Sequence, residues 1–160
     1  MKQINLTVGA TCDDCSGLGG WAFVLRYGEH SLERSGGSSG AMKGRMELEA
    51  LFEGLKAIKE PCYVVLFSEN QHLVDGLICQ RKEWRQTQFW RLSRKSPHLL
   101  VDGDLWEALD PHAERHFLQG QCVGNPSDAP DLNRCLELAE AQAAHYAAAP
   151  TSPDLIDWPA

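Results

Sequence analysis

The sequence predicts a single α/β domain built on a mixed five-stranded sheet, with three antiparallel strands followed by two strands in α/β units and helices on both faces. Three observations support this prediction. Residues 4–8 alternate apolar and polar side chains, and glycines at 19–20 and 28 bound the two short strands expected next. Residues 44–59 have the three- and four-residue apolar spacing of a helix. Residues 62–68 form an unbroken apolar run, which is typical of a strand covered on both faces.

The first three strands are expected to form an antiparallel meander. Ile4, Leu6 and Val8 alternate with polar residues, and Gly28-Glu29 is a turn signal between two of the strands. The expected strands are 3–10, 21–27 and 30–35, and the Gly- and Ser-rich residues 36–43 are expected to be a loop.

The helix over residues 44–59 follows that loop and is stopped by Pro61. Its apolar stripe consists of Met46, Ala50, Leu51, Gly54, Leu55 and Ile58. Glu47 lies at the edge of this stripe. Such a residue is either a solvated helix residue or an inward-facing metal ligand, and the stretch alone favours the first.

The second half of the chain supplies the remaining elements. Ser68-Glu69-Asn70 ends the central strand and is expected to cap a short helix over 71–79. A helical piece at 105–109, a fifth strand at 116–119 and an Ala-rich helix at 131–149 are then expected. Pro150 ends that helix, so the domain is expected to span 1–149, with an irregular tail over 150–160.

Composition narrows the class of protein. No apolar run reaches the roughly 18 residues of a membrane span, and the polar amino-terminus is unlike a signal peptide, so a cytoplasmic location without membrane contact is expected. The six cysteines are then reduced. Four of them, Cys62, Cys79, Cys122 and Cys135, are expected to be small buried apolar residues. A zinc site is a second interpretation of Cys12, Cys15, His112 and His116, but their spacing is unlike a zinc finger.

Residues 81–95 form a basic segment in an acidic protein. The segment has a net charge of +5, which leaves −12 for the rest of a chain whose total is −7. Its basic and aromatic residues are Arg81, Lys82, Trp84, Arg85, Trp90, Arg91, Arg94 and Lys95. Cations alternating with aromatic rings are typical of a surface that binds phosphates and packs against bases or sugars. A solvated helix with core tryptophans is the other interpretation.

Several motifs in the same order resemble the ribonuclease HI family. Arg45-Met46-Glu47-Leu48 matches an R-M-E-L motif, and residues 68–74 are similar to a [T/S]-D-S-x-Y pattern. Asp104-Leu105-Trp106 resembles a D-L-W stretch, and residues 133–139 resemble an N/E-R-C-D-E-L-A helix. The resemblance covers residues 3–149. It implies the five-stranded fold and hydrolysis of the RNA strand of an RNA/DNA hybrid with two divalent ions.

The resemblance fails at the residues that would perform this chemistry. Of the four carboxylate positions, Glu47 and Glu69 keep an acid, whereas Val8 and Leu136 are aliphatic and have no atom that coordinates a metal. Gln121 stands where the resemblance puts a histidine. Two carboxylates make a poor site for Mg²⁺ or Mn²⁺, so no cofactor is expected. If any metal binds, Asp13 and Asp14 are the acids that would complete the set with Glu47 and Glu69.

Three functions follow from these residues. The preferred one is a ribonuclease H-like domain that binds RNA/DNA hybrid or another nucleic acid through the basic segment and has lost its endonuclease activity. The second is an active ribonuclease H with a rearranged Mg²⁺ or Mn²⁺ site. The third is a structural or protein-interaction domain, which the overall acidity and the apolar Leu155, Ile156 and Trp158 of the tail favour.

Overall fold

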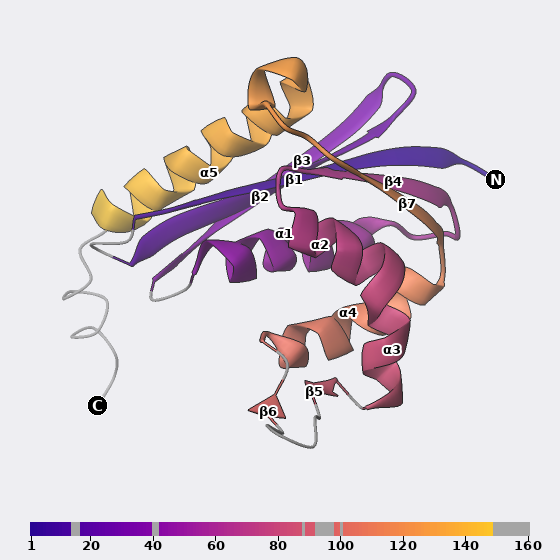
Figure 1. The fold of residues 1–160 in the computed structure, drawn as a ribbon. Helices are drawn as coiled ribbons and strands as arrows, with labels where there is room; N and C mark the ends of the chain where they lie inside the picture. The colour runs from indigo at the N-terminus through magenta and orange to yellow at the C-terminus, as the bar shows by residue number, and fades with distance from the viewer. Residues whose placement is uncertain (14–16, 40–41, 88, 92–97, 100, 149–160) are drawn as a thin grey trace, which may run out of the picture.

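The structure is a computed structural model that describes residues 1–13, 17–39, 42–87, 89–91, 98–99 and 101–148, with backbone only at 90–91, 98–99 and 146–148 (Figure 1). The expected tail, 150–160, lies outside these residues. Within the described part, no helix has the length and apolar character needed to cross a membrane.

A five-stranded sheet forms the centre of the molecule, as predicted. The strands are β1 (Gln3–Cys12), β2 (Leu18–Tyr27), β3 (His30–Ser39), β4 (Tyr63–Ser68) and β7 (Phe117–Cys122), in the order β3-β2-β1-β4-β7. The first three are antiparallel neighbours, whereas β4 is parallel to both β1 and β7. The carboxyl ends of β1, β4 and β7 therefore lie at the same edge of the sheet.

Strand β3 is longer than the sequence predicted, because it continues to Ser39 through residues expected to form a loop. Gly36 pairs with Trp21 of β2, and a side chain at Gly36 would begin 2.7 Å from the Trp21 ring. The Gly- and Ser-rich composition thus leaves room for an indole ring on this edge strand rather than making a loop.

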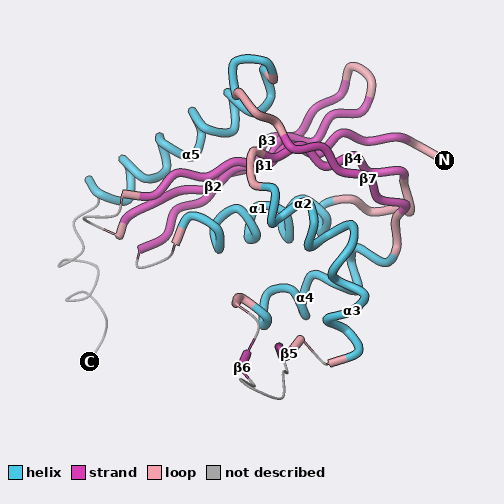
Figure 2. Tube along the Cα trace, viewed as in Figure 1, coloured by secondary structure: helices cyan, strands magenta, loops and turns pink. Residues whose placement is uncertain are grey.

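Two helices cover opposite faces of the sheet (Figures 1 and 2). Helix α1 (Lys43–Ala57) packs on the face that carries Leu6 and Val8, where a side chain at Gly54 would begin 2.6 Å from Leu6. Helix α5 (Pro130–Ala148) packs on the other face, so close that a side chain at Gly9 would begin 3.0 Å from Cys135. Glycines at these two positions allow both helices to reach the sheet.

The remaining helices extend the α1 side of the molecule. Helix α2 (Gln71–Asp75), the π-helical turn η1 (Gly76–Gln80) and α3 (Arg81–Gln86) follow one another without a break and run past the expected end at residue 79. Helix α4 (Gly103–Glu114) is also longer than predicted and packs on α1. A small hairpin, β5 (Trp90–Arg91) with β6 (His98–Leu99), lies between α3 and α4 in the chain.

Candidate active site and nucleic-acid interface

The two family carboxylates meet in one pocket at the edge of the sheet where β4 and β7 end. Glu47 comes from the first turns of α1, and Glu69 directly follows β4. The pocket has a volume of about 490 Å³ and is lined by Lys43, Glu47, Glu69, Asn70, Gln71, Cys122, Val123 and Gly124. The prediction that Glu47 faces inward, rather than into solvent, is thus the one that fits the structure.

Glu47 is buried, with only 3% of its surface exposed. Its Oε1 accepts a hydrogen bond of 3.1 Å from Nδ2 of Asn70, whereas its Oε2 is buried without a partner among the described residues. Burial raises the pKa of the Glu47 carboxyl above its usual range, although the Asn70 hydrogen bond and the charge of Lys43 oppose this shift. Oδ1 of Asn70 meanwhile accepts from the backbone N–H groups of His72 and Leu73, which is the predicted helix cap.

Glu69 has a cationic partner that the sequence analysis did not consider. Its Oε1 lies 3.2 Å from Nζ of Lys43, the first residue of α1. The sequence signal was weak, since a lysine in a Gly- and Ser-rich stretch is commonly a solvated residue. In the structure, the ammonium belongs to the carboxylate pocket.

The two aliphatic residues at family carboxylate positions are part of the packed interior. Val8 is fully buried on the α1 face, in the same cluster as Leu48, Leu51 and Leu66. Leu136 is half-buried on α5, and its Cδ2 would lie 3.4 Å from a side-chain carbon at Gly9, the residue after Val8. Both positions are thus occupied by packed methyl groups.

Asp13, one of the two acids proposed to complete a metal site, does not line this pocket. Asp13 follows the end of β1 and is exposed; it lines a separate pocket with Glu140 of α5. Because an extended strand rises about 3.3 Å per residue, Asp13 lies roughly 16 Å beyond Val8 along the chain. Asp14 lies outside the described residues.

Gln121, which stands where the resemblance puts a histidine, is part of the last strand of the sheet. It lies within β7 and pairs with Phe67 of β4, which in turn pairs with Thr7 of β1. Because side chains alternate along a strand, Gln121 faces the opposite side of the sheet from Val8. The strand was expected to end at residue 119, whereas the chain leaves it only after Cys122.

The donor set does not fit a two-metal centre. Magnesium and manganese prefer a shell of oxygen ligands, and here two carboxylates face an ammonium that already contacts one of them. In the part of the chain that the structure describes, no three His, Cys, Asp or Glu side chains gather to hold a metal ion. The same holds for the described zinc candidates Cys12, His112 and His116, which do not gather at one place. Cys15 lies outside the described residues.

The separation of the remaining zinc candidates follows from strand direction. Cys12 ends β1, whereas His116 directly precedes β7, and the two strands run the same way. His116 accepts the backbone N–H of Cys62 at Nδ1, and His112 packs edge-on against Phe52. Of the four solitary cysteines, Cys62 and Cys135 are buried as expected, but Cys79 is exposed and Cys122 is half-buried at the carboxylate pocket.

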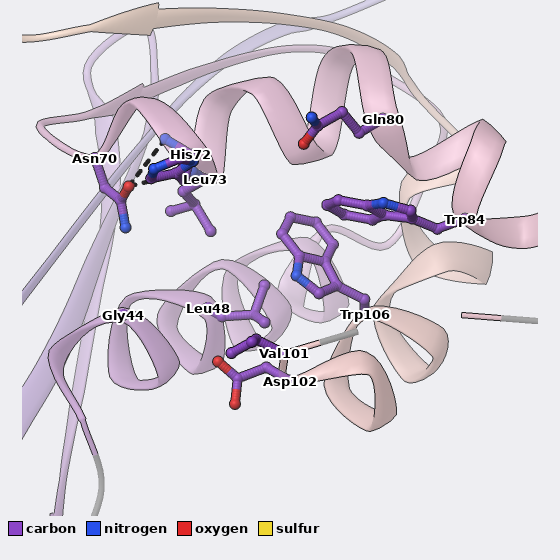
Figure 3. Close-up of a pocket in the computed structure, with 10 residues that line it drawn as sticks. All are labelled: Gly44, Leu48, Asn70, His72, Leu73, Gln80, Trp84, Val101, Asp102 and Trp106. Carbon is purple, nitrogen blue, oxygen red and sulfur yellow. Dashed lines mark hydrogen bonds between the residues drawn. The ribbon is translucent and has the colours of Figure 1, made fainter. Parts of the chain in front are cut away.

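A second pocket, with a volume of about 480 Å³, adjoins the carboxylate pocket and shares Asn70 with it (Figure 3). Figure 3 shows His72, Gln80 and Trp84 on one wall, with Gly44 and Leu48 from α1 and Trp106 from α4 on the other. The Trp84 and Trp106 rings pack edge to face with centroids 5.1 Å apart. Of these residues, only Trp84 was a predicted site residue.

Arg45 of the R-M-E-L motif contacts one residue that lines this second pocket, which we call the aromatic pocket. Its guanidinium donates to Asp102 at 3.0 Å and to both carboxylate oxygens of Asp104, so it joins the starts of α1 and α4. Asp102, which also lines the pocket, has a left-handed backbone with φ of 58°. Such a conformation is costly for a non-glycine residue, and the Arg45 contacts help to hold it.

Two arginines of the basic segment are committed to an internal ion-pair network, which the sequence analysis did not foresee. Arg81 is 4% exposed and donates to Asp110 and Glu114 of α4. Arg85 donates to the same two carboxylates at 2.6–2.8 Å. Arg81 is therefore a structural residue rather than a surface phosphate contact, and half-exposed Arg85 is neutralised by the same acids.

The other predicted basic and aromatic residues divide into two groups. Lys82 is exposed on α3, two residues before Trp84 in the chain. Trp90 and Arg91 make up β5, where the structure describes the backbone alone. Arg94 and Lys95 lie outside the described residues. Within the described part, Lys82 and ion-paired Arg85 of the predicted interface are thus exposed, and Trp84 is half-buried at the second pocket.

The sequence is similar to known ribonucleases H over most of its length. Residues 2–143 match the family model described as RNase H. The chain is 33% identical to Ribonuclease H of Rhizobium meliloti over 87% of this chain and 89% of that protein. It is 36% identical to Ribonuclease H of Symbiobacterium thermophilum over 88% of this chain and 95% of that protein.

Solved structures show the same fold at lower sequence identity. LC9-RNase H1, described as a type 1 RNase H with the type 2 active-site motif, superposes with a TM-score of 0.75 at 18% identity, over 91% of this chain and 74% of that one. LC11-RNase H1 in complex with RNA/DNA hybrid superposes with a TM-score of 0.63 at 13% identity, over 91% of this chain and 99% of that one. On the family match and these relatives, the chain belongs to the ribonuclease H family.

Proposed function

We propose that this ribonuclease H-fold domain binds RNA/DNA hybrid, or another nucleic acid, without cleaving it. The observation that carries the proposal is the carboxylate pocket: Glu47 and Glu69 are present, but fully buried Val8 and half-buried Leu136 stand at the other two family positions. An aliphatic side chain cannot hold a divalent ion. Without such ions, the activated water and the stabilised leaving oxygen of the family's reaction have no source.

The binding part of the proposal rests on the adjoining aromatic pocket. Half-buried Trp84 and largely buried Trp106 line this pocket beside the polar Asn70, His72 and Gln80. Indole rings contact bases and sugars without requiring a given sequence, which suits a protein that reads the shape of a hybrid. Exposed Lys82 lies on the same helix as Trp84, and it is the cation that we expect to contact phosphate beside this helix.

An active enzyme with a rearranged divalent-metal site is the second candidate, because the relatives above carry the name Ribonuclease H at 33–36% identity. LC9-RNase H1, whose description gives it the active-site motif of the other type, supports the idea that this motif varies among proteins of the fold. For this chain, Mg²⁺ or Mn²⁺ would be the cofactor. A cytoplasmic location and a domain over residues 1–149 are parts of the same proposal.

Salt-dependent binding tests the proposal. Fluorescence anisotropy with labelled RNA/DNA hybrid and with duplex DNA, from roughly 50 to 200 mM salt, should show affinity that falls steeply as salt rises. Lys82→Ala should weaken binding to both and reduce the slope of log K against log salt by about 1. Lys59→Ala, two residues beyond the end of α1, is the control and should leave the slope unchanged. Absence of hybrid binding at roughly 50 mM salt would favour the third interpretation, a protein-interaction domain.

A further inference from the structure

Lys43 and Glu47 lie on the same side of α1. They are four residues apart, one helical turn, so their side chains project from one face. Glu69 approaches the same face from the end of β4, and its Oε1 lies 3.2 Å from the Lys43 ammonium. Three charged side chains from two elements thus share the pocket.

The electrostatics of this pocket require a cation. Two carboxylates in one pocket repel each other, and buried Oε2 of Glu47 has no hydrogen-bond partner among the described residues. Lys43 is the one cationic side chain among the described residues that line the pocket. Its charge also acts on Glu47, since it lowers the pKa that burial raises.

We infer that Lys43 is the resident cation of the carboxylate pocket: its ammonium takes the place that divalent ions have in the family and keeps Mg²⁺ and Mn²⁺ out. An ammonium neutralises carboxylates but has no vacant coordination position for a water or a phosphate oxygen. This inference rests on the proposed function and names the residue that makes the pocket independent of metal. The pocket is therefore a converted site with its own counter-charge rather than a site that only lost two ligands.

The inference makes a direct prediction for Mn²⁺ binding. A positive charge a few ångströms from a divalent ion lowers its affinity by at least roughly tenfold, even with the screening of water. Lys43→Met keeps the length of the side chain and removes the charge, whereas Lys43→Arg keeps the charge. Lys56→Met is the matched control, because Lys56 is an exposed lysine on the same helix that pairs with Glu53 instead.

The experiment measures free Mn²⁺ by electron paramagnetic resonance and the change in melting temperature with Mn²⁺ for each protein. We expect Lys43→Met to bind Mn²⁺ at least roughly tenfold more tightly than the unaltered protein and to gain a melting-temperature increase. Lys43→Arg and Lys56→Met should behave like the unaltered protein. Adding Glu47→Gln to Lys43→Met should abolish the gain, which locates the ion in this pocket.

Three results would overturn the inference: equal Mn²⁺ affinity of Lys43→Met and the unaltered protein, an equal gain in Lys56→Met, or a gain that survives Glu47→Gln. Failure of the proposed function is separate, since it would show in the hybrid-binding and cleavage assays of the unaltered protein. Melting curves without metal show that each variant is folded before its Mn²⁺ binding is compared.

Discussion

Arg81 of α3 is buried against Asp110 of α4, and this contact joins the two helices that carry Trp84 and Trp106 of the aromatic pocket. Burial alone would raise the pKa of the Asp110 carboxyl, but hydrogen bonds from Arg85 and Arg81 outweigh it and hold that pKa below its usual range. A basic residue in a charged segment can thus be buried and join two helices through an ion pair. The cationic surface available to a nucleic acid is smaller than the local charge of the segment indicates.

Replacement of Asp110 by Ala should destabilise the fold. The change leaves the buried Arg81 guanidinium with exposed Glu114 as its remaining carboxylate, and breaking a buried pair typically costs about 3–5 kcal/mol. For a domain of this size, each kcal/mol lowers the melting temperature by about 2–4 °C. Thermal unfolding measured by circular dichroism checks the prediction. Glu33→Ala removes the partner of Arg134 at an exposed site and is the control; an equal effect there would contradict a special role for the buried pair.

Glu47 should make the protein less stable as pH rises from acid to neutral. Its pKa is raised in the folded state, so the unfolded chain releases the proton first and gains stability relative to the fold above its usual pKa, which is about 4.5. The destabilisation grows from that pH until the folded carboxyl also ionises. Glu47→Gln should therefore melt higher than the unaltered protein at pH 7, and the difference should shrink toward pH 4. A difference that does not vary with pH would show that Glu47 is not held in this environment.

The double variant Val8→Asp with Leu136→Asp should melt lower in metal-free buffer. Val8 is fully buried, so an acid there loses hydration and faces Glu47 and Glu69 from the same edge of the sheet. Mg²⁺ should restore part of the loss by binding the folded state alone. Differential scanning calorimetry with EDTA and with Mg²⁺ measures both effects. A higher melting temperature than that of the unaltered protein in EDTA would contradict the packing described for these residues.

Much of the sheet was predictable because its signals are local. Alternation in β1, the apolar run of β4 and the amphipathic stripe of α1 depend on neighbouring residues. The same local signals put Glu47 at the edge of the stripe but favoured a solvated position for it. The Asn70 cap was predictable for the same reason, since a short polar side chain can satisfy the first N–H groups of the helix that follows it.

The roles of the charged residues were not predictable in the same way. Arg81 and Arg85 pair with carboxylates 25 to 33 residues later in the chain, and no local pattern gives that distance. Lys43 contacts an acid 26 residues away for the same reason. The position of Gln121 within β7 was not predictable either, because the sequence pattern does not show that this strand continues to Cys122. The end of a strand and the partners in an ion pair depend on contacts between elements far apart in the chain, so a local sequence pattern does not determine them.

Cleavage of RNA/DNA hybrid tests the central claim most directly. Hybrid labelled on the RNA strand is incubated with the purified protein in Mg²⁺ and, separately, in Mn²⁺, and the products are resolved by denaturing electrophoresis. Glu47→Gln is the control, because contaminating nuclease from the expression host would be unaffected by that change. We predict that the RNA strand stays intact with the unaltered protein while anisotropy shows the hybrid to be bound. Cleavage by the unaltered protein that disappears in Glu47→Gln would contradict the account and show that the pocket is an active metal site.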